Sequence, residues 1–181
     1  MYRWGEETSS AEPRTGKSPA TFPTIRHPMN ALELKIPPPV VAFLLALAMS
    51  AVSRVTLTFA ADGPVRIAVA VSLALVGGAF SVAGMTAFRR VKTTMNPMKP
   101  EAASSLVTSG IYGVTRNPMY VGLLFVFVGW AAFLCAPWTL AGPVVFVIYM
   151  TRFQIGSEEE ALMAAFPEAY ASYKARVRRW L

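Results

Sequence analysis

Four long apolar runs, separated by short polar or charged connections, constrain the fold of this chain more than any other feature of its sequence. A helix needs about 20 mostly apolar residues, with a range of about 17–25, to cross the hydrocarbon core of a bilayer. The runs cover about residues 38–61, 65–88, 118–135 and 138–153, and each reaches or nearly reaches this length. They predict an all-α integral membrane protein with four transmembrane helices.

Prolines and glycines mark the ends and contacts of these helices. The first run follows the prolines at 37–39, which a helix tolerates only in its first turn. Residues 61–64 predict a tight turn before the second run, and Gly77 and Gly84 inside that run predict close packing against a neighbouring helix. Residues 136–137 alone join the third run to the fourth, so we expect these two to form a hairpin.

The composition agrees with a lipid environment. Hydrophobic residues make up 54% of the chain and charged residues 15%, against about 45–50% and about 25% in soluble domains. This excludes a disordered chain, and the single cysteine, Cys135, excludes a disulfide scaffold. The net charge of +7 comes from basic residues interleaved with apolar runs, which favours an anionic membrane surface over nucleic acid as partner. With His27 as the only histidine, no histidine metal cluster is expected.

Lysines and arginines gather on one side of the predicted bundle. One group lies in the loop 89–117 and another in the region after Arg152, while the turn between the third and fourth runs carries no charge. Because cytoplasmic loops carry the excess of Lys and Arg, we expect both groups and both termini to be cytoplasmic. The sequence therefore predicts a protein of the plasma (inner) membrane whose long polar loop faces the cytoplasm.

The two ends of the chain differ from the apolar runs. Residues 1–28 are polar and contain no apolar run, so we expect a disordered tail ahead of a membrane domain at 29–181. Residues 158–180 are amphipathic, and Pro167 divides them into two short helices that we expect to lie on the inner membrane surface or to cap the bundle. One stripe joins the apolar residues of these helices: Leu162, Phe166, Tyr170, Tyr173, Val177 and Trp180.

The polar loop ends in the motif GIYGVTRNPMYVG, residues 110–122. Asn117 before Pro118 predicts a helix start, with Asn as the cap and Pro in the first turn. Arg116 beside that helix N-terminus favours an anion such as a carboxylate. The alternative is purely structural, a capped membrane helix with one cytoplasmic arginine.

A second motif, SEEE at residues 157–160, follows the fourth run. In one interpretation it is a capping box, with Ser157 as the cap and Glu160 three residues later, and the acidic first turn complements the helix dipole. In the other, carboxylates at the membrane interface of a basic protein bind a cationic ligand. The motif alone does not decide between them.

Two longer segments contain these motifs. They are LVTSGIYGVTRNPMYVG at residues 106–122 and EEEALMAAFPEAYASYKARVRRW at residues 158–180. Together they resemble the isoprenylcysteine carboxyl methyltransferase family of integral membrane methyltransferases, which is akin to the phospholipid methyltransferases. The resemblance implies S-adenosylmethionine-dependent methyl transfer at the cytoplasmic membrane face. It also implies that the last helical hairpin, the preceding loop and the C-terminal segment enclose the cofactor.

The resemblance also implies which residues form the site. Arg116 and one of Glu158 and Glu159 would bind the opposite charges of the cofactor, and tyrosines would wall the pocket. Arg179, which matches a terminal arginine of the family, would be the catalytic residue that orients an anionic acceptor. The implied cofactor-binding residues are Gly110, Tyr112, Arg116, Asn117, Pro118, Tyr120, Gly122, Glu158 and Glu159.

The sequence leaves the identity of the methyl acceptor open. It is a carboxylate, a thiol or a lipid amine, carried by a membrane-partitioned or small molecule. Two alternatives to methyl transfer also remain: a membrane oxidoreductase of the sterol-reductase type with a nicotinamide cofactor, and a non-catalytic four-helix membrane module. Binding of S-adenosylmethionine, of a nicotinamide nucleotide or of neither discriminates among the three.

Overall fold

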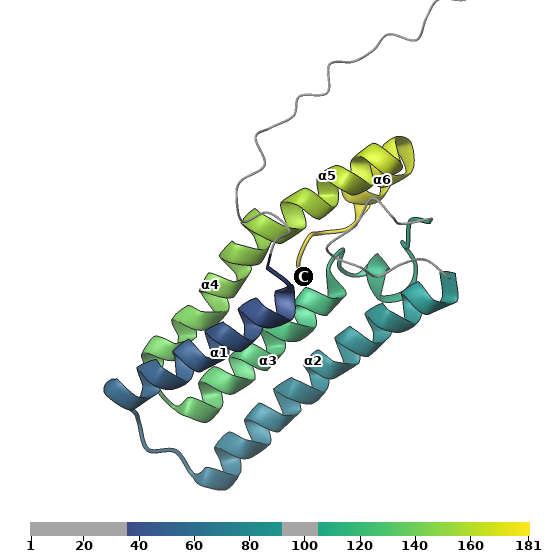
Figure 1. The fold of residues 1–181 in the computed structure, drawn as a ribbon. Helices are drawn as coiled ribbons and strands as arrows, with labels where there is room; N and C mark the ends of the chain where they lie inside the picture. Colours follow the sequence, from purple (N-terminus) through teal and green to yellow (C-terminus); the bar gives the residue numbers. More distant parts are fainter. Residues whose placement is uncertain (1–35, 92–104) are drawn as a thin grey trace, which may run out of the picture.

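The computed structural model describes residues 36–91 and 105–181, and in these ranges the regular elements are all helical (Figure 1). The all-α prediction is therefore confirmed for the described residues. The predicted disordered tail, and residues 92–104 of the predicted loop, lie outside them. The helices are α1 (Pro38–Val55), α2 (Gly63–Val91), η2 (Gly110–Gly113), α3 (Pro118–Leu134), η3 (Pro137–Leu140), α4 (Ala141–Tyr149), η4 (Met150–Ile155), α5 (Gly156–Ala165) and α6 (Pro167–Arg176).

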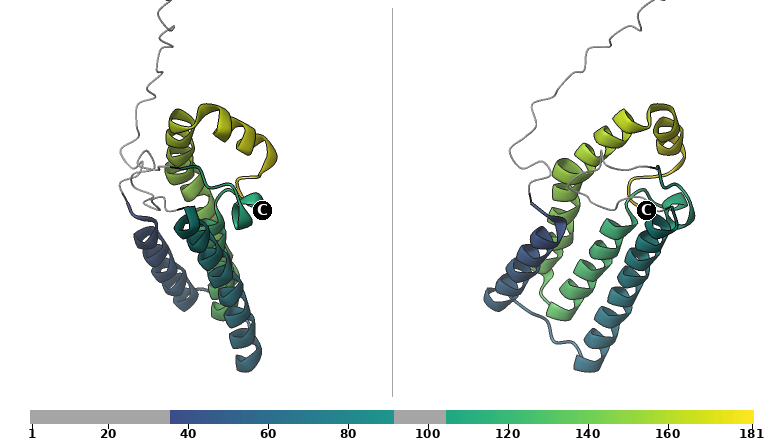
Figure 2. Two further views of the ribbon diagram at one scale, coloured as in Figure 1. Left: turned by 90° about the vertical axis from the view of Figure 1, so that its right-hand side faces the viewer. Right: turned by 45° about the vertical axis from the view of Figure 1, so that its right-hand side comes forward.

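Helices α1, α2, α3 and α4 form a bundle in which α3 is central (Figures 1 and 2). Helix α3 packs along α2 on one side and contacts α1 and α4 on the other. Beyond the bundle, α5 follows α4 and η4 without a break but leans over the polar end of the bundle, and α6 folds back toward η2 (Figure 2). The polar end of the molecule is therefore built from the start of α1, the end of α2, the start of α3 and the α5–α6 pair.

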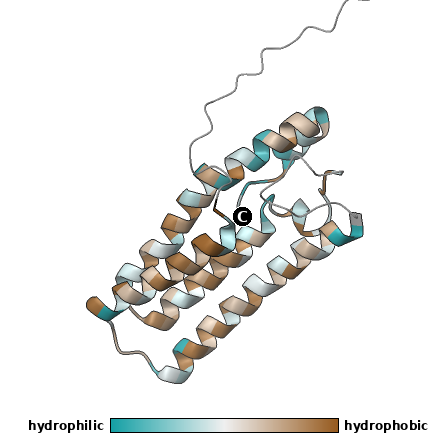
Figure 3. Cartoon of the chain, in the orientation of Figure 1, coloured by the Kyte–Doolittle hydropathy of each residue, from teal (hydrophilic) through white to brown (hydrophobic). Residues whose placement is uncertain are grey.

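Within residues 36–91 and 105–181, three helical stretches are long and apolar enough to cross a membrane: Pro38–Val55, Gly63–Arg90 and Pro137–Ala165. Hydrophobic residues dominate the bundle helices (Figure 3). Large apolar side chains such as Phe43, Leu75 and Ile148 are exposed, as expected where the solvent is lipid. Helix α3, with 17 residues, is apolar but shorter. The described part of the chain is thus a helical protein with three candidate spans, and a fourth span at α3 stays a prediction.

Small residues bring α2 and α3 into close contact, as the glycines of the second run predict. A Cβ atom at Gly77 would overlap the carbonyl oxygen of Gly122, and one at Gly122 would overlap Ser81 Oγ. Nearer the polar end, a Cβ at Gly84 would lie 3.2 Å from Pro118 Cγ. Lipid provides no hydrophobic drive between helices, so this backbone approach supplies much of their attraction.

The first helix is shorter than predicted, because it ends at Val55 and not near residue 61. Thr56 is extended, with φ −118° and ψ 166°, and the Phe59 N–H donates to the carbonyl of Cys135 at 3.0 Å. The predicted tight turn at 61–64 is also wrong, because α2 already begins at Gly63 and residues 57–62 before it have no regular structure. A bond to a distant carbonyl thus replaces the last helical turn.

The fourth helix is longer than predicted, because Pro137–Ala165 is continuous and does not stop near residue 153. The π-helical turn η4 joins α4 to α5, and Ile155 keeps helical angles of φ −65° and ψ −38°. Ser157 therefore lies inside a helix, and the predicted capping box does not form. The acidic motif does not face a free helix N-terminus either, which removes the helix-dipole explanation for its charges.

The helix is interrupted before Pro167 as predicted, because Phe166 takes the non-helical angles φ −137° and ψ 62°. Helix α6 then ends at Arg176, before the predicted end at residue 180, and we call the extended residues 177–181 the C-terminal strap. Most of the predicted apolar stripe packs in one cluster with Tyr112, so α6 caps the bundle. Trp180 leaves this stripe with the strap and packs against the main core of the bundle.

Candidate functional site

A cavity of about 470 Å³ lies at the polar end of the bundle. Its wall comes from the start of α1, the end of α2, the start of α3 and helices α5 and α6, so elements far apart in the sequence meet there. Most of the lining is apolar or aromatic, with a few charged groups. The lining residues that the argument below uses are Phe88, Tyr112, Arg116, Asn117, Pro118, Tyr120, Leu123, Glu158, Glu159, Tyr170 and Tyr173.

Most of the predicted cofactor-binding residues meet at this cavity. Arg116 and Asn117 come from the loop before α3, Tyr120 from the first turn of α3, and Glu158 and Glu159 from α5. Tyr112 and Pro118 line it as well. Three of the predicted residues do not line the cavity: Gly110, Gly122 and Arg179.

These three residues have other positions. Gly110 is exposed and takes φ +65°, a left-handed backbone conformation that glycine adopts without strain. Gly122 faces α2 and allows the close helix contact described above. Arg179 lies in the C-terminal strap, and its guanidinium is bonded to a carboxylate and does not point into the cavity. The two glycines therefore shape the fold around the site and lie outside the lining of the cavity.

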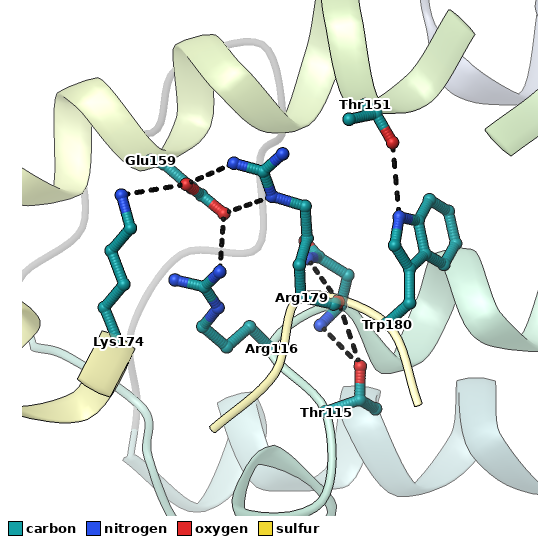
Figure 4. A network of polar contacts seen from close by, with 8 residues as sticks. Thr115, Arg116, Thr151, Glu159, Lys174, Arg179 and Trp180 are labelled. Carbon is teal, nitrogen blue, oxygen red and sulfur yellow. Dashed lines mark hydrogen bonds and ion pairs between the residues drawn. The ribbon is translucent and has the colours of Figure 1, made fainter. Parts of the chain in front are cut away.

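Glu159 is the centre of a cluster of three basic side chains (Figure 4). Arg179 forms a bidentate pair with it, with Nε to Oε1 and Nη2 to Oε2 both at 2.8 Å. Arg116 Nη2 lies 3.2 Å from Oε1, and Lys174 Nζ lies 3.5 Å from Oε2. Both oxygens of the Glu159 carboxylate are thus used by protein groups. The bidentate bond from Glu159 raises the pKa of Arg179 above its ordinary value.

Arg116 is only partly satisfied by this cluster. Its side chain is 9% exposed, and among the residues that the structure describes its Nε and Nη1 atoms have no hydrogen-bond partner. Leaving buried donors of a charged group unpaired costs free energy, so such donors mark a place where a ligand is expected. Since Arg116 also lines the cavity, its unpaired N–H groups favour an anion there.

Glu158, in contrast to Glu159, is not paired with a basic group among its described contacts. Its Oε1 accepts hydrogen bonds from Tyr120 Oη at 2.6 Å and from Gln154 Nε2 at 3.0 Å, and the carboxylate lines the cavity. Gln154 is a site residue that sequence reasoning missed. It lies in the π-helical turn, and such turns often occur at functional sites.

Asn117 does not cap α3 with its side chain, contrary to the sequence prediction. Its Nδ2 donates instead to the carbonyl of Arg179 at 2.9 Å, although Pro118 occupies the first turn of α3 as predicted. Thr115, the preceding buried polar residue, also donates to that carbonyl, at 3.2 Å. The loop before α3 is therefore bonded to the C-terminal strap, which hydropathy patterns do not reveal.

Buried tyrosines form the wall opposite the bundle. Tyr112 packs edge-on against Phe88, with ring centroids 5.5 Å apart, and its carbonyl accepts a bond from Tyr173 Oη at 2.7 Å. Burial raises the pKa of Tyr170 to about 12 and also raises the pKa values of Tyr112 and Tyr173. These phenols stay neutral near pH 7, so they provide hydrogen bonds and aromatic surface.

An apolar groove runs along the bundle below the cavity. It has a volume of about 550 Å³ and lies between α1, α2 and α3, with a lining that includes Phe43, Ile67 and Trp130. Leu123 lines both the groove and the cavity, so the two spaces are adjacent at this side chain. The charged cavity therefore lies next to an apolar groove between α1, α2 and α3.

The arrangement suits a small molecule that carries both charges and apolar or aromatic parts. Arg116 offers donors for an anion, Glu158 offers a carboxylate for a cation, and Tyr112 and its neighbours offer aromatic walls. Among residues 36–91 and 105–181, no group of His, Cys, Asp and Glu side chains is placed to hold a metal ion. The site can therefore bind a zwitterion beside an apolar chain.

Comparison with known proteins identifies the family. The family model described as phospholipid methyltransferase matches residues 65–169, which is more than half of the chain and includes α2, α3 and the acidic pair. Protein-S-isoprenylcysteine O-methyltransferase of Mus musculus is 40% identical over 76 residues, which are 40% of this chain and 26% of that protein. No solved structure matches the chain.

Two further relatives match parts of this chain. Protein-S-isoprenylcysteine O-methyltransferase B of Arabidopsis thaliana is 33% identical over 88 residues, or 47% of this chain and 43% of that protein. An uncharacterized protein of Haemophilus influenzae is 36% identical over 63 residues, which are 35% of this chain and all of that protein. The matches thus span less than half of either named enzyme. The resemblance drawn from the two motifs is confirmed, and the chain belongs to the phospholipid methyltransferase family, with isoprenylcysteine methyltransferases among its relatives.

Proposed function

We propose that this protein transfers a methyl group from S-adenosylmethionine to a membrane-partitioned acceptor. The observation that carries the proposal is one cavity lined by an arginine with unpaired buried donors and by a carboxylate without a basic partner. S-adenosylmethionine presents a carboxylate, an ammonium, a sulfonium and an aromatic base. Family membership and the names of the relatives support methyl transfer.

In this proposal Arg116 binds the cofactor carboxylate. Its Nε and Nη1 atoms each need an acceptor, and a cofactor carboxylate at the cavity wall would accept a charge-assisted hydrogen bond from one of them. Binding would also lower the cost of burying this guanidinium, because a paired charge is tolerated where an unpaired donor is not. Arg116 is the anion-binding group that the sequence motif favours.

Within the acidic pair, we assign the cofactor's positive charge to Glu158. Glu159 already uses both oxygens for Arg116, Arg179 and Lys174, and a cationic ligand would have to displace one of them. Glu158 accepts both of its described hydrogen bonds on Oε1, which leaves its other oxygen for a ligand in the cavity. Tyr120 and Gln154 fix its direction.

The cofactor supplies the activated methyl group, so the protein mainly has to orient it and exclude water. Phe88, Tyr112 and Tyr170 provide the apolar and aromatic walls that exclude water from the cavity. Arg179 touches Glu159 and not the cavity, and we therefore assign it a positioning role in place of the catalytic role implied by the family motif.

The groove between α1, α2 and α3 favours a lipophilic acceptor. Its lining is entirely apolar, and it meets the charged cavity at Leu123. A molecule with a hydrocarbon tail in this groove would place its polar head beside the methyl donor. A carboxylate, thiolate or lipid amine on that head would accept the methyl group.

The test of the proposal is a transfer assay with radiolabelled S-adenosylmethionine and the full-length protein in detergent or nanodiscs. Total membrane lipids, prenylcysteine analogues and small thiols are offered separately, and we expect label in a lipid-soluble product. Binding of a nicotinamide nucleotide in place of S-adenosylmethionine would favour the reductase alternative. Binding of neither would favour a non-catalytic module.

We further propose that the site faces the cytoplasm of the plasma (inner) membrane, with α3 as a fourth span. The test uses a Cys135→Ala background with one new cysteine, either Ser109→Cys near the cavity or Trp138→Cys at the opposite end, both at exposed positions. An impermeant thiol reagent applied to intact cells should label only Trp138→Cys. Labelling of Ser109→Cys alone would show that the orientation is the reverse of the proposed one. Labelling of both variants would rule out α3 as a span.

Residues 1–28 are proposed to be dispensable, with residues 29–181 forming the membrane methyltransferase domain. The segment is polar and lies outside both motifs, residues 106–122 and 158–180. Deleting it should leave membrane insertion intact and S-adenosylmethionine affinity within about twofold of the full chain, because no motif residue is removed. A larger loss of affinity in a titration of the truncated protein would place the tail in the site.

A further inference from the structure

The C-terminal strap is attached to the loop before α3 at Thr115 (Figure 4). Thr115 is completely buried, and its hydroxyl donates to the carbonyl of Arg179 at 3.2 Å while accepting the N–H of Asn117 at 3.2 Å. Because this buried hydroxyl both donates and accepts a hydrogen bond, it holds the strap and the loop before α3 in one fixed arrangement. Thr115 itself does not line the cavity.

Arg116 is fixed from two sides through this junction. Its backbone N–H donates to the carbonyl of Arg178 at 2.9 Å, which attaches the Arg116 backbone to the strap. At the other end, its Nη2 meets Glu159, and Glu159 is held by the guanidinium of Arg179. Both ends of the Arg116 side chain therefore depend on the position of the strap.

This double attachment matters because arginine has many rotamers. Ordering a free arginine side chain on binding costs conformational entropy, which pre-organisation avoids. Arg116 is held with Nε and Nη1 unpaired at the cavity wall. If the strap shifts, the backbone of Arg116 and its carboxylate partner shift with it.

We propose that Thr115 is a positioning residue of this enzyme: its hydroxyl locks the C-terminal strap to the loop and thereby aims Arg116 at the carboxylate of the methyl donor. This inference rests on the proposed S-adenosylmethionine site. It makes the affinity for the carboxylate, and not the affinity for the rest of the ligand, depend on a hydroxyl that never touches the ligand.

The experiment compares wild type, Thr115→Val and Thr115→Ser by calorimetric titration of the full-length protein. The two ligands are S-adenosylmethionine and its decarboxylated analogue. Valine matches the shape of threonine and lacks the hydroxyl, whereas serine keeps it. We expect Thr115→Val to bind S-adenosylmethionine about 3- to 10-fold more weakly, the size of one lost hydrogen bond, and to bind the analogue within about twofold of wild type. Thr115→Ser should bind both ligands like wild type.

Equal losses for both ligands, unchanged binding in Thr115→Val, or a loss in Thr115→Ser as large as in Thr115→Val would each overturn the inference. If wild type itself does not bind S-adenosylmethionine, the proposed function fails instead. Should Thr115→Val not fold, Trp180→Phe tests the same device, because the Trp180 indole anchors the strap to Thr151 Oγ1 at 3.2 Å. The same selective loss is expected, and equal losses for both ligands would again overturn the inference.

Discussion

Glu158→Gln is expected to weaken S-adenosylmethionine binding about 10- to 100-fold, the effect of losing one charge-assisted hydrogen bond. Glutamine keeps a carbonyl oxygen for the bonds from Tyr120 and Gln154, so only the negative charge is lost. The melting temperature should therefore change little. Titration and a thermal melt of the same preparation measure the two effects.

The neighbouring variant, Glu159→Gln, is the matched comparison and, unlike Glu158→Gln, should lower the melting temperature. It leaves the buried Arg116 guanidinium without its described carboxylate partner and breaks the bidentate pair with Arg179. Breaking a buried ion pair costs about 3–5 kcal/mol, and we expect the lower end because Arg179 and Lys174 are 33% and 46% exposed. A loss of stability in Glu158→Gln with none in Glu159→Gln would contradict the assignment of the two roles.

Gly77→Ala is expected to lower the free energy of unfolding in detergent by about 1–3 kcal/mol, the usual cost of overpacking. The new methyl group would overlap the carbonyl oxygen of Gly122, and a backbone atom cannot move away as a flexible side chain can. The helices would have to separate. Since Phe88 at the end of α2 lines the cavity, cofactor affinity should fall as well.

Gly78→Ala is the control, because it makes the same chemical change one residue later in the same helix. Nothing lies within 4 Å of a Cβ at Gly78. This variant should be as stable as wild type or gain up to about 1 kcal/mol from the higher helix propensity of alanine. Equal losses in the two variants would show that the α2–α3 contact at Gly77 does not explain the loss of stability.

The sequence by itself determined the helical membrane class and the main residues around the cavity. Long apolar runs reveal membrane helices because lipid offers no hydrogen-bond partner to backbone N–H and C=O groups, which must therefore bond within the helix. This requirement does not depend on how the neighbouring helices pack. The break at Pro167 was equally readable, since proline restricts the residue before it. The motifs around Arg116 and Glu158 were readable as family signatures, and the cavity unites them.

Only the tertiary structure decided where helices end and what each charged residue does. The first helix stops at Val55 because Phe59 bonds to the carbonyl of Cys135 just after α3, and the fourth continues through a π-helical turn that puts Ser157 inside a helix. Apart from Gln154, the partners of Glu158 and Glu159 come from residues distant in the sequence. Local patterns encode propensity and periodicity, whereas the partner of a buried charge is set by which segments meet in space.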